Sequence, residues 1–134
     1  MKGPIIWTNL LIIAVGGALG ANARYLLALW AGGRFGFEFP YGTLLANASG
    51  SLALGFILSL TTDRLPLSPE MRLLLTVGFL SSFTTFSSYT VESLNLWRAY
   101  GAWYSLLNVL GNNLAAFGAA VLGMALARWL QSGG

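Results

Sequence analysis

A strip of hydroxyl and aromatic side chains interrupts an apolar part of this sequence, in the segment GFLSSFTTFSSYTVES at positions 78–93. Between positions 81 and 90 it holds seven serine or threonine hydroxyls and three rings. The rings of Phe83, Phe86 and Tyr89 lie three residues apart, with hydroxyls such as that of Ser88 between them. Hydroxyls donate hydrogen bonds and rings have positive edges, so this strip can stabilise an anion that has lost its water.

Two rows of polar side chains share the helical spacing i, i+4, i+8. The rows are Thr43, Asn47 and Ser51 in one stretch, and Tyr104, Asn108 and Asn112 in another. Each row places three hydrogen-bonding groups on one helix face over about 12 Å. One interpretation is hydrogen bonding that only holds helices together, and the other is a polar pathway; two aligned triplets favour the pathway.

The sign of the charges indicates which ion such a pathway would carry. The four acidic residues are Glu38, Asp63, Glu70 and Glu92, and the first three lie in or beside predicted loops. A cation path would be expected to use carboxylates, whereas amide and hydroxyl donors suit a small anion. The residues alone therefore indicate a narrow anion pathway.

Catalytic chemistry has few residues available. The chain contains no cysteine and no histidine, which excludes disulfides, thiolate or imidazole metal sites and Ser-His-Asp catalysis. No general acid/base pair is visible either. We expect the protein not to be an enzyme, and we find no reason to expect nucleic acid as a partner.

The elements that must position these groups are four charge-free stretches at positions 3–23, 39–62, 73–91 and 99–127. The chain is 56% hydrophobic and only 8% charged, with a mean hydropathy of +0.70. About 20 apolar helical residues cross a hydrocarbon layer of roughly 30 Å. We predict an all-α integral membrane protein whose 134 residues form one domain of four transmembrane helices in the cell (inner) membrane.

Three connectors and one break divide these helices. The connectors are AGGRFGFEFP at 31–40, TDRLPLSPE at 62–70 with Ser68 as the N-cap of the next helix, and RAYG at 98–101. Clustered serine and threonine side chains can bond to backbone carbonyls and draw a helix out of its regular ladder. We therefore expect the third transmembrane helix to be broken at mid-membrane, between Gly78 and Thr90.

Rows of small residues predict close helix packing and dimer formation, because lipid provides no hydrophobic force between helices. The rows are Gly16, Gly17, Gly20 and Ala21, and Gly111, Ala115, Ala119, Gly123 and Ala127. Basic residues predict little about orientation. With the amino terminus on one side, that side has Lys2, Arg64, Arg72 and Arg128, and the other has Arg24, Arg34 and Arg98. This near tie indicates weakly determined, possible dual orientation, or noise in a small protein.

Three segments resemble one known family, the small bacterial fluoride channels of the CrcB (Fluc) type. They are GGALGANARY at 16–25, PYGTLLANASGS at 40–51 and the strip at 78–93, and with Tyr104 they cover nearly the whole chain in the family's order. The resemblance implies an antiparallel homodimer of dual topology with two pores, a central sodium ion, and fluoride export that relieves toxicity.

The resemblance also implies roles for individual residues. Asn47 matches the pore-lining asparagine of the second helix, and Thr43 lies on the same track. Phe86 matches the first of two rings that offer their edges to fluoride, and Tyr104 and Asn108 match the polar track of the fourth helix. Glu92 matches the acidic residue after the break, and Arg24 the arginine of the first segment, with a structural or vestibule role.

Two departures from the family pattern concern the second ring and the sodium site. The second ring is usually Phe but is Tyr89 here, so either the ring edge is kept with an added hydroxyl or selectivity is altered. The break usually begins Gly-Gly and here begins Ser81-Ser82. The carbonyls implied to hold sodium are those of Ser81 and Thr84, which requires Ser81 to adopt dihedrals that glycine adopts easily.

We expect passive electrodiffusion of fluoride past Asn47, the hydroxyl rows and the ring edges, with chloride excluded by the narrow, donor-rich path. The alternative is a four-helix antiporter of the small multidrug resistance type, which needs a carboxylate within the membrane that the first stretch lacks. A noncatalytic assembly subunit would account for the small-residue rows but not for the two polar triplets.

Overall fold

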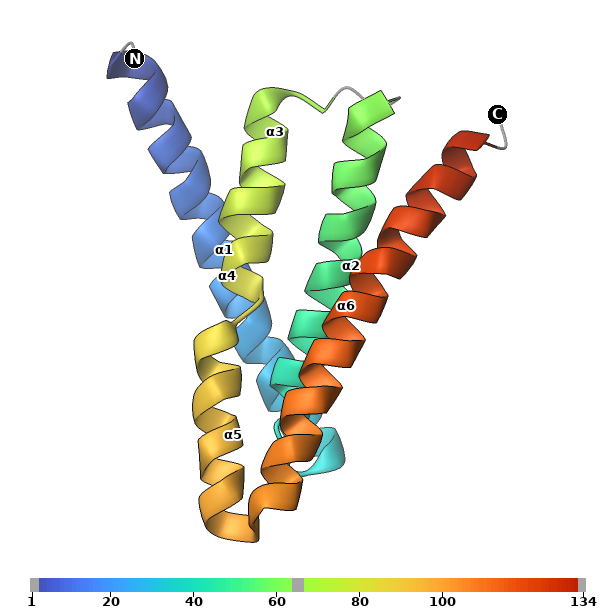
Figure 1. The fold of residues 1–134 in the computed structure, drawn as a ribbon. Helices are drawn as coiled ribbons and strands as arrows, with labels where there is room; N and C mark the ends of the chain where they lie inside the picture. The colour runs from blue at the N-terminus through green and yellow to red at the C-terminus, as the bar shows by residue number, and fades with distance from the viewer. Residues whose placement is uncertain (1–2, 64–66, 133–134) are drawn as a thin grey trace.

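The computed structural model describes residues 3–63 and 67–132, and within these ranges it is helical, with no strand. Its elements are α1 Gly3–Phe35, α2 Tyr41–Asp63, α3 Pro69–Leu73, the π-helix η1 Leu74–Leu80, α4 Ser81–Phe83, α5 Phe86–Tyr100 and α6 Ala102–Ser132. Both termini lie at one end of the bundle, and the α1–α2 and α5–α6 turns lie at the other (Figure 1). Lys2 and Arg64, which were counted above for orientation, lie outside the described residues.

Three of these helices are long and apolar enough to cross a membrane, over Ile5–Phe35, Tyr41–Leu60 and Ala102–Ser132. The stretch expected to form the third crossing is divided among η1, α4 and α5. The first helix continues past Arg24, where the charge-free stretch ends, to Phe35, and the Arg24 side chain bonds to the Ser82 carbonyl. Together the helices form a multi-pass membrane protein.

The turns follow local backbone chemistry. Gly36 and Gly101 have φ angles of 92° and 91°, a region that side chains disfavour, and each ends a long helix. The first connector is accordingly shorter than expected and covers only residues 36–40. Ser68 is the N-cap of α3, as predicted, and its Oγ accepts from the Met71 N–H at 3.2 Å.

The helical path is interrupted at two residues between α4 and α5. Thr84 has a ψ of 155° and Thr85 has a φ of −151°, so both are extended. The expected break from Gly78 to Thr90 is wider than this, because hydroxyls elsewhere in the strip bond to carbonyls of their own helix. Thr90 Oγ1, for example, donates to the Phe86 carbonyl at 2.9 Å. Such a bond can be made without leaving the helix.

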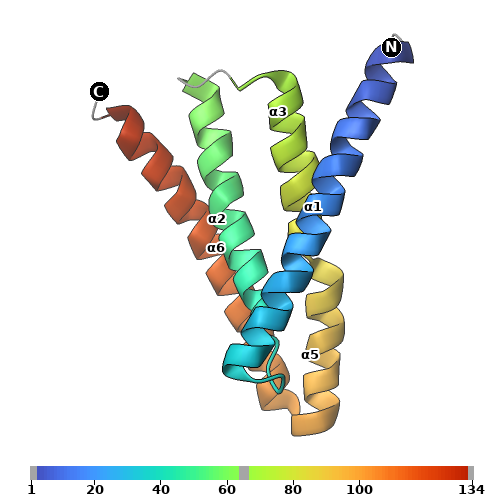
Figure 2. The ribbon, with the colours of Figure 1, turned by 180° about the vertical axis from the view of Figure 1, so that it is seen from behind.

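Two seams of small residues hold the bundle together, one between α1 and η1 and the other between α2 and α6. A Cβ on Gly16 would lie 2.9 Å from the Gly78 Cα, so these backbones are in direct contact. On the other seam, Gly123 lies against the Leu52 carbonyl. Gly111, which was expected in the same row, has nothing within 4 Å. From these seams α1 and α6 diverge towards the end that holds the termini (Figure 2).

Candidate functional site

Asn47 of α2 holds the interrupted backbone between α4 and α5. Its Oδ1 accepts from the Thr85 N–H at 2.8 Å, and its Nδ2 donates to the Thr85 carbonyl at 3.1 Å. The side-chain amide thus supplies the acceptor that the Thr85 N–H loses where the helix is interrupted, and adds a donor to the carbonyl of this N-cap residue. A backbone group left without a partner away from water costs about 1–3 kcal/mol, so Asn47 stabilises the break.

A chain of side-chain amides extends from Asn47 across α6 to α5. Asn47 Nδ2 donates to Asn112 Oδ1 at 3.0 Å, and Asn112 Nδ2 donates to Asn108 Oδ1 at 2.9 Å. Asn108 Nδ2 then donates to Ser93 Oγ at 2.9 Å. Asn108 is fully buried and Asn112 is 4% exposed. The predicted rows on α2 and α6 therefore meet in one hydrogen-bonded chain, which links three helices.

A cavity of about 210 Å³ lies beside this chain. Its walls include Asn47, Ser51, Thr85, Phe86, Tyr89 and Asn112. The rings of Phe86 and Tyr89 lie 5.3 Å apart between centroids, and the Tyr89 hydroxyl accepts from Asn113 Nδ2 at 3.0 Å. The extra hydroxyl of Tyr89 therefore has a partner, and its ring lines the cavity. Amides, hydroxyls and rings from α2, α5 and α6 are thus brought together at this cavity.

Arg24 connects the two sides of the break from α1. Its Nε donates to the Ser82 carbonyl at 3.2 Å, and its Nη1 lies 3.5 Å from Ser88 Oγ. Ser88 belongs to the first turn of α5, where its N–H donates to the N-cap oxygen Thr85 Oγ1 at 3.2 Å. Arg24 therefore links α4 to α5.

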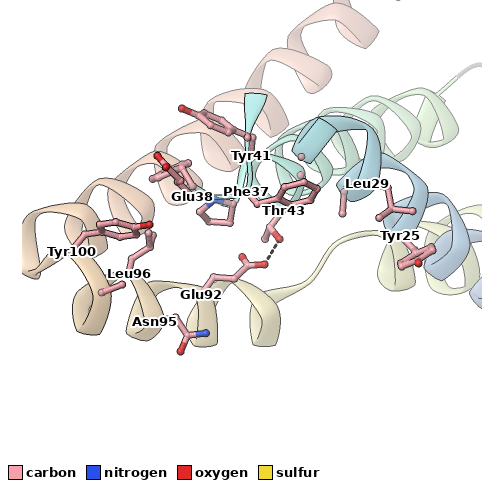
Figure 3. A pocket seen from close by; sticks show the side chains of 17 residues that line it. Tyr25, Leu29, Phe37, Glu38, Tyr41, Thr43, Glu92, Asn95, Leu96 and Tyr100 are labelled. Carbon is pink, nitrogen blue, oxygen red and sulfur yellow. Dashed lines mark hydrogen bonds between the residues drawn. The ribbon is translucent and has the colours of Figure 1, made fainter. Parts of the chain in front are cut away.

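A larger cavity of about 430 Å³ lies at the end of the bundle that holds the α1–α2 turn. Figure 3 shows Thr43 and Glu92 facing each other inside it, and Thr43 Oγ1 donates to Glu92 Oε1 at 2.8 Å. Glu92 Oε2 is buried, with no hydrogen-bond partner among the described residues. The lining residues include the carboxylates of Glu38 and Glu92 and neither lysine nor arginine. The larger cavity therefore contains two carboxylates among its lining groups, whereas the smaller one combines amides and hydroxyls with rings and has no charged residue among the described ones.

The carbonyls of Ser81 and Thr84 have lost their regular helical donors. The N–H four residues after Ser81 belongs to Thr85 and donates to Asn47, and the N–H four residues after Thr84 belongs to Ser88 and donates to Thr85 Oγ1. Ser81 has φ −65° and ψ −29°, which any residue adopts. Serine in place of glycine is therefore compatible with this backbone, and both carbonyls have lone pairs that could bind a cation.

Two predicted site residues, Tyr104 and Phe83, lie outside the amide chain and line neither cavity. Tyr104 is 47% exposed, with its ring 5.3 Å from that of Tyr100, and Phe83 stacks on Phe79 at 5.7 Å. Asn113, which donates to the Tyr89 hydroxyl, and Ser93, which ends the amide chain, were not singled out from the sequence. Ser93 could have been found, because it follows Tyr89 by one helical turn.

Comparisons with known proteins identify the family of this chain. The model of the family described as "CrcB-like protein, Camphor Resistance (CrcB)" matches residues 11–124. A protein of Roseiflexus sp. (strain RS-1) is 47% identical over 91% of this chain and 98% of its own length. A protein of Legionella pneumophila (strain Paris) is 41% identical over 92% of both chains. Both are named "Fluoride-specific ion channel FluC", a function that involves no catalysis. This chain, as its three sequence segments predicted, belongs to the CrcB-like family.

Proposed function

We propose that this protein is a fluoride-selective ion channel, which exports fluoride by passive electrodiffusion and so relieves its toxicity. The observation that carries the proposal is the cavity beside Asn47, where amide, hydroxyl and ring groups meet at an interrupted helix. Irregular backbone within a membrane is tolerated where it is buried in protein or lines a cavity. The names of the relatives support fluoride as the ion.

The pathway uses groups that replace water around a small anion. Fluoride loses water to Asn47 and the hydroxyls beside it, then passes the ring edges of Phe86 and Tyr89, whose positive hydrogens suit an anion. Chloride is larger, and its lower charge density gains less from the same donors. The acidic cavity at Glu92 is suited to a hydrated entrance and not to the step at which fluoride loses its water.

The tryptophans support a position for the break near the middle of the membrane. All five are exposed, and such rings concentrate at membrane interfaces. Trp7 and Trp30 are separated along α1 by roughly 35 Å of helix, slightly more than the hydrocarbon thickness. Ser82 lies beside Gly17, almost midway between them. The interruption at residues 84–85 is therefore assigned to mid-membrane.

An antiparallel homodimer would complete the pathway. Phe86 and Phe117 line the smaller cavity yet are 76% and 73% exposed, so a single chain leaves the cavity open on this side. A second copy in the opposite orientation would cover these rings. The near tie in basic residues between the two ends supports dual topology.

Sodium at the centre of the dimer is also proposed. The carbonyls of Ser81 and Thr84 would hold it, because their helical donors are engaged elsewhere. Carbonyl oxygen is a suitable ligand for a hard cation, and the ion would supply a fixed positive charge between the two breaks. The residues present therefore fit such a site.

Fluoride efflux from proteoliposomes tests the function, with potassium and valinomycin to carry the balancing charge. Wild-type protein should dissipate a fluoride gradient without any gradient of protons or cationic drug, and chloride should remain inside. Asn47→Asp removes the amide donors and places a carboxylate on an anion path, so efflux should fall by about two orders of magnitude.

Asn22→Asp is the matched control, because Asn22 is exposed and bonds to the Ala18 carbonyl of its own helix. It should keep the wild-type rate. Efflux of wild-type speed from Asn47→Asp would remove the assignment of Asn47. Efflux that requires a proton gradient would instead favour the antiporter, which is already disfavoured because α1 contains no Asp or Glu.

A further inference from the structure

Both N–H groups of Asn47 are already engaged. One donates to the Thr85 carbonyl and the other to Asn112 Oδ1. The bond to Thr85 is half of a reciprocal pair that supports the broken backbone, whereas the bond to Asn112 is a single contact between side chains. An anion that enters the cavity would therefore take over the N–H that now points at Asn112.

Asn112 opposes an anion in this arrangement. Both of its own N–H groups point at Asn108, one to the backbone carbonyl at 3.2 Å and one to Oδ1 at 2.9 Å. It therefore presents only its oxygen to Asn47, and that oxygen would be left facing the ion. An amide that turned about its last bond would present N–H groups instead, but its oxygen would then face Asn108 Oδ1.

Ser93 removes this conflict, because its hydroxyl can end the chain in either direction. It now accepts from Asn108 Nδ2 and donates to the Tyr89 carbonyl at 2.8 Å. A hydroxyl has one donor and two acceptor positions and rotates freely. If Asn108 also turned, Ser93 could donate to its oxygen, and the Tyr89 carbonyl would keep its helical N–H partner.

We propose that the chain Ser93–Asn108–Asn112 reverses its hydrogen-bond direction when fluoride binds beside Asn47, so that Asn112 changes from acceptor to donor. Ser93 is the positioning residue for this reversal and does not itself touch the ion. The proposal rests on the proposed fluoride pathway. The chain crosses from α5 through α6 to α2, so the reversal couples three helices (Figure 1).

The exchange of hydrogen bonds favours fluoride over chloride. Fluoride binding with reversal gives up three bonds, from Asn47 to Asn112 Oδ1, from Asn112 to the Asn108 carbonyl and from Ser93 to the Tyr89 carbonyl. In return, Asn47 and Asn112 each donate to an ion, and hydrogen bonds to a charged acceptor are about twice as strong as neutral ones. Chloride is a weaker hydrogen-bond acceptor, so the bonds it gains do not offset those lost and the chain keeps its resting direction. The chain therefore adds to the selectivity for fluoride.

Nuclear magnetic resonance of the side-chain amides tests the reversal directly. The protein is labelled with ¹⁵N-asparagine in micelles and titrated with sodium fluoride, and with sodium chloride as the reference. We expect fluoride to shift the signals of Asn47, Asn112 and the distant Asn108. Shifts confined to Asn47 and Asn112 would overturn the proposal, because a displaced bond alone does not reach Asn108.

Flux through Ser93 variants supplies the second test. Ser93→Ala should lower the fluoride rate about tenfold and reduce the preference over chloride, whereas Ser93→Thr, which keeps the hydroxyl, should restore both. Thr90→Ala is the matched control, since Thr90 also donates to a carbonyl of α5 but is exposed. Wild-type flux and selectivity in Ser93→Ala would overturn the proposed reversal.

The two proposals fail in different ways. Suppose that wild-type protein passes fluoride and the Asn47 signal shifts. If the Asn108 signal then responds as it does to chloride, and Ser93→Ala conducts like the wild type, only the proposed reversal is wrong. If fluoride shifts no asparagine signal and no fluoride leaves the vesicles, the channel function itself is wrong. Thermal melting of each variant in micelles identifies any loss of flux that arises from misfolding.

Discussion

The two helix seams of this bundle both bring backbones into close contact, but they differ in the groups that lie beside the contact. Between α1 and η1, the backbones at Gly16 and Gly78 are in direct contact. Between α2 and α6, the contact at Gly123 is equally close, but one part of the interface is given to Asn47 and Asn112 and has a cavity beside it. In the first seam the helices can move little relative to each other, whereas the second seam contains polar side chains that can exchange hydrogen-bond partners.

This difference separates scaffold from pathway. In lipid, helices associate through close packing and interhelical hydrogen bonds, and polar groups are retained where they face protein or water. The α1 seam fixes η1, and Arg24 extends this support to the interruption between α4 and α5. Substitutions in the first seam should therefore act on folding, and substitutions in the second on conduction.

The largest effect is expected at the glycine seam. The Cβ of Gly16→Ala would lie 2.7 Å from the Leu74 carbonyl oxygen and 2.9 Å from the Gly78 Cα, and neither backbone can yield as a side chain would. We expect a loss of about 3 kcal/mol in the free energy of unfolding, at the upper end for overpacked cores. Reversible unfolding in mixed micelles, followed by tryptophan fluorescence, measures it.

The matched control for this prediction is Gly118→Ala on α6. Nothing lies within 4 Å of the added Cβ in one chain, and alanine is the better helix former by about 1 kcal/mol. This variant should be as stable as the wild type or slightly more so. Equal losses from the two variants would mean that glycine flexibility, and not close approach, explains the seam.

Most of the architecture could be predicted from the sequence because it follows from composition and spacing. Three of the four charge-free stretches coincide with helices long and apolar enough to cross a membrane, and the rows containing Asn47 and Asn112 meet through a hydrogen bond. The extent of the break could not be predicted, because whether a hydroxyl leaves or keeps its helix depends on its partners. Thr85 leaves the helix because Asn47 Oδ1 provides another acceptor for its N–H. Thr90 stays in the helix, where its hydroxyl bonds to the Phe86 carbonyl.

Tertiary contacts also decided which residues join the site. Ser93 is one of the hydroxyls of the strip and bonds within its own helix to the Tyr89 carbonyl, and the position of Asn108 on α6 gives it a partner on a second helix. Tyr104 shares a helical row with Asn108 and Asn112, but the row leaves the interface towards the α5–α6 turn, where Tyr104 is exposed in one chain. The spacing of residues along one helix does not show how far the interface with a neighbouring helix extends.

A smaller effect is expected where a polar group loses a single partner. Thr43→Val keeps the shape of the side chain but removes the hydroxyl that donates to Oε1 of Glu92. The second carboxylate oxygen, Oε2, is already buried with no hydrogen-bond partner in the part of the chain that the structure describes. We expect a loss of about 2 kcal/mol in stability. Thr76→Val, whose hydroxyl bonds to the Arg72 carbonyl of its own turn, should cost clearly less in the same unfolding assay. A loss at Thr43 no larger than that at Thr76 would mean that the Glu92 carboxylate gains nothing from this contact.

The smallest effect concerns the ring that departs from the family pattern. Tyr89→Phe removes only the hydroxyl that accepts from Asn113, and Asn113 keeps its bond to the Val109 carbonyl at 2.7 Å. Stability should therefore change by about 1 kcal/mol or less, and fluoride efflux should stay within about twofold, because the ring edge remains in the cavity. Tyr89→Leu removes the edge and should slow efflux much more. If Tyr89→Phe and Tyr89→Leu conduct equally, the ring is only packing, and the polar seam conducts through its amides and hydroxyls alone.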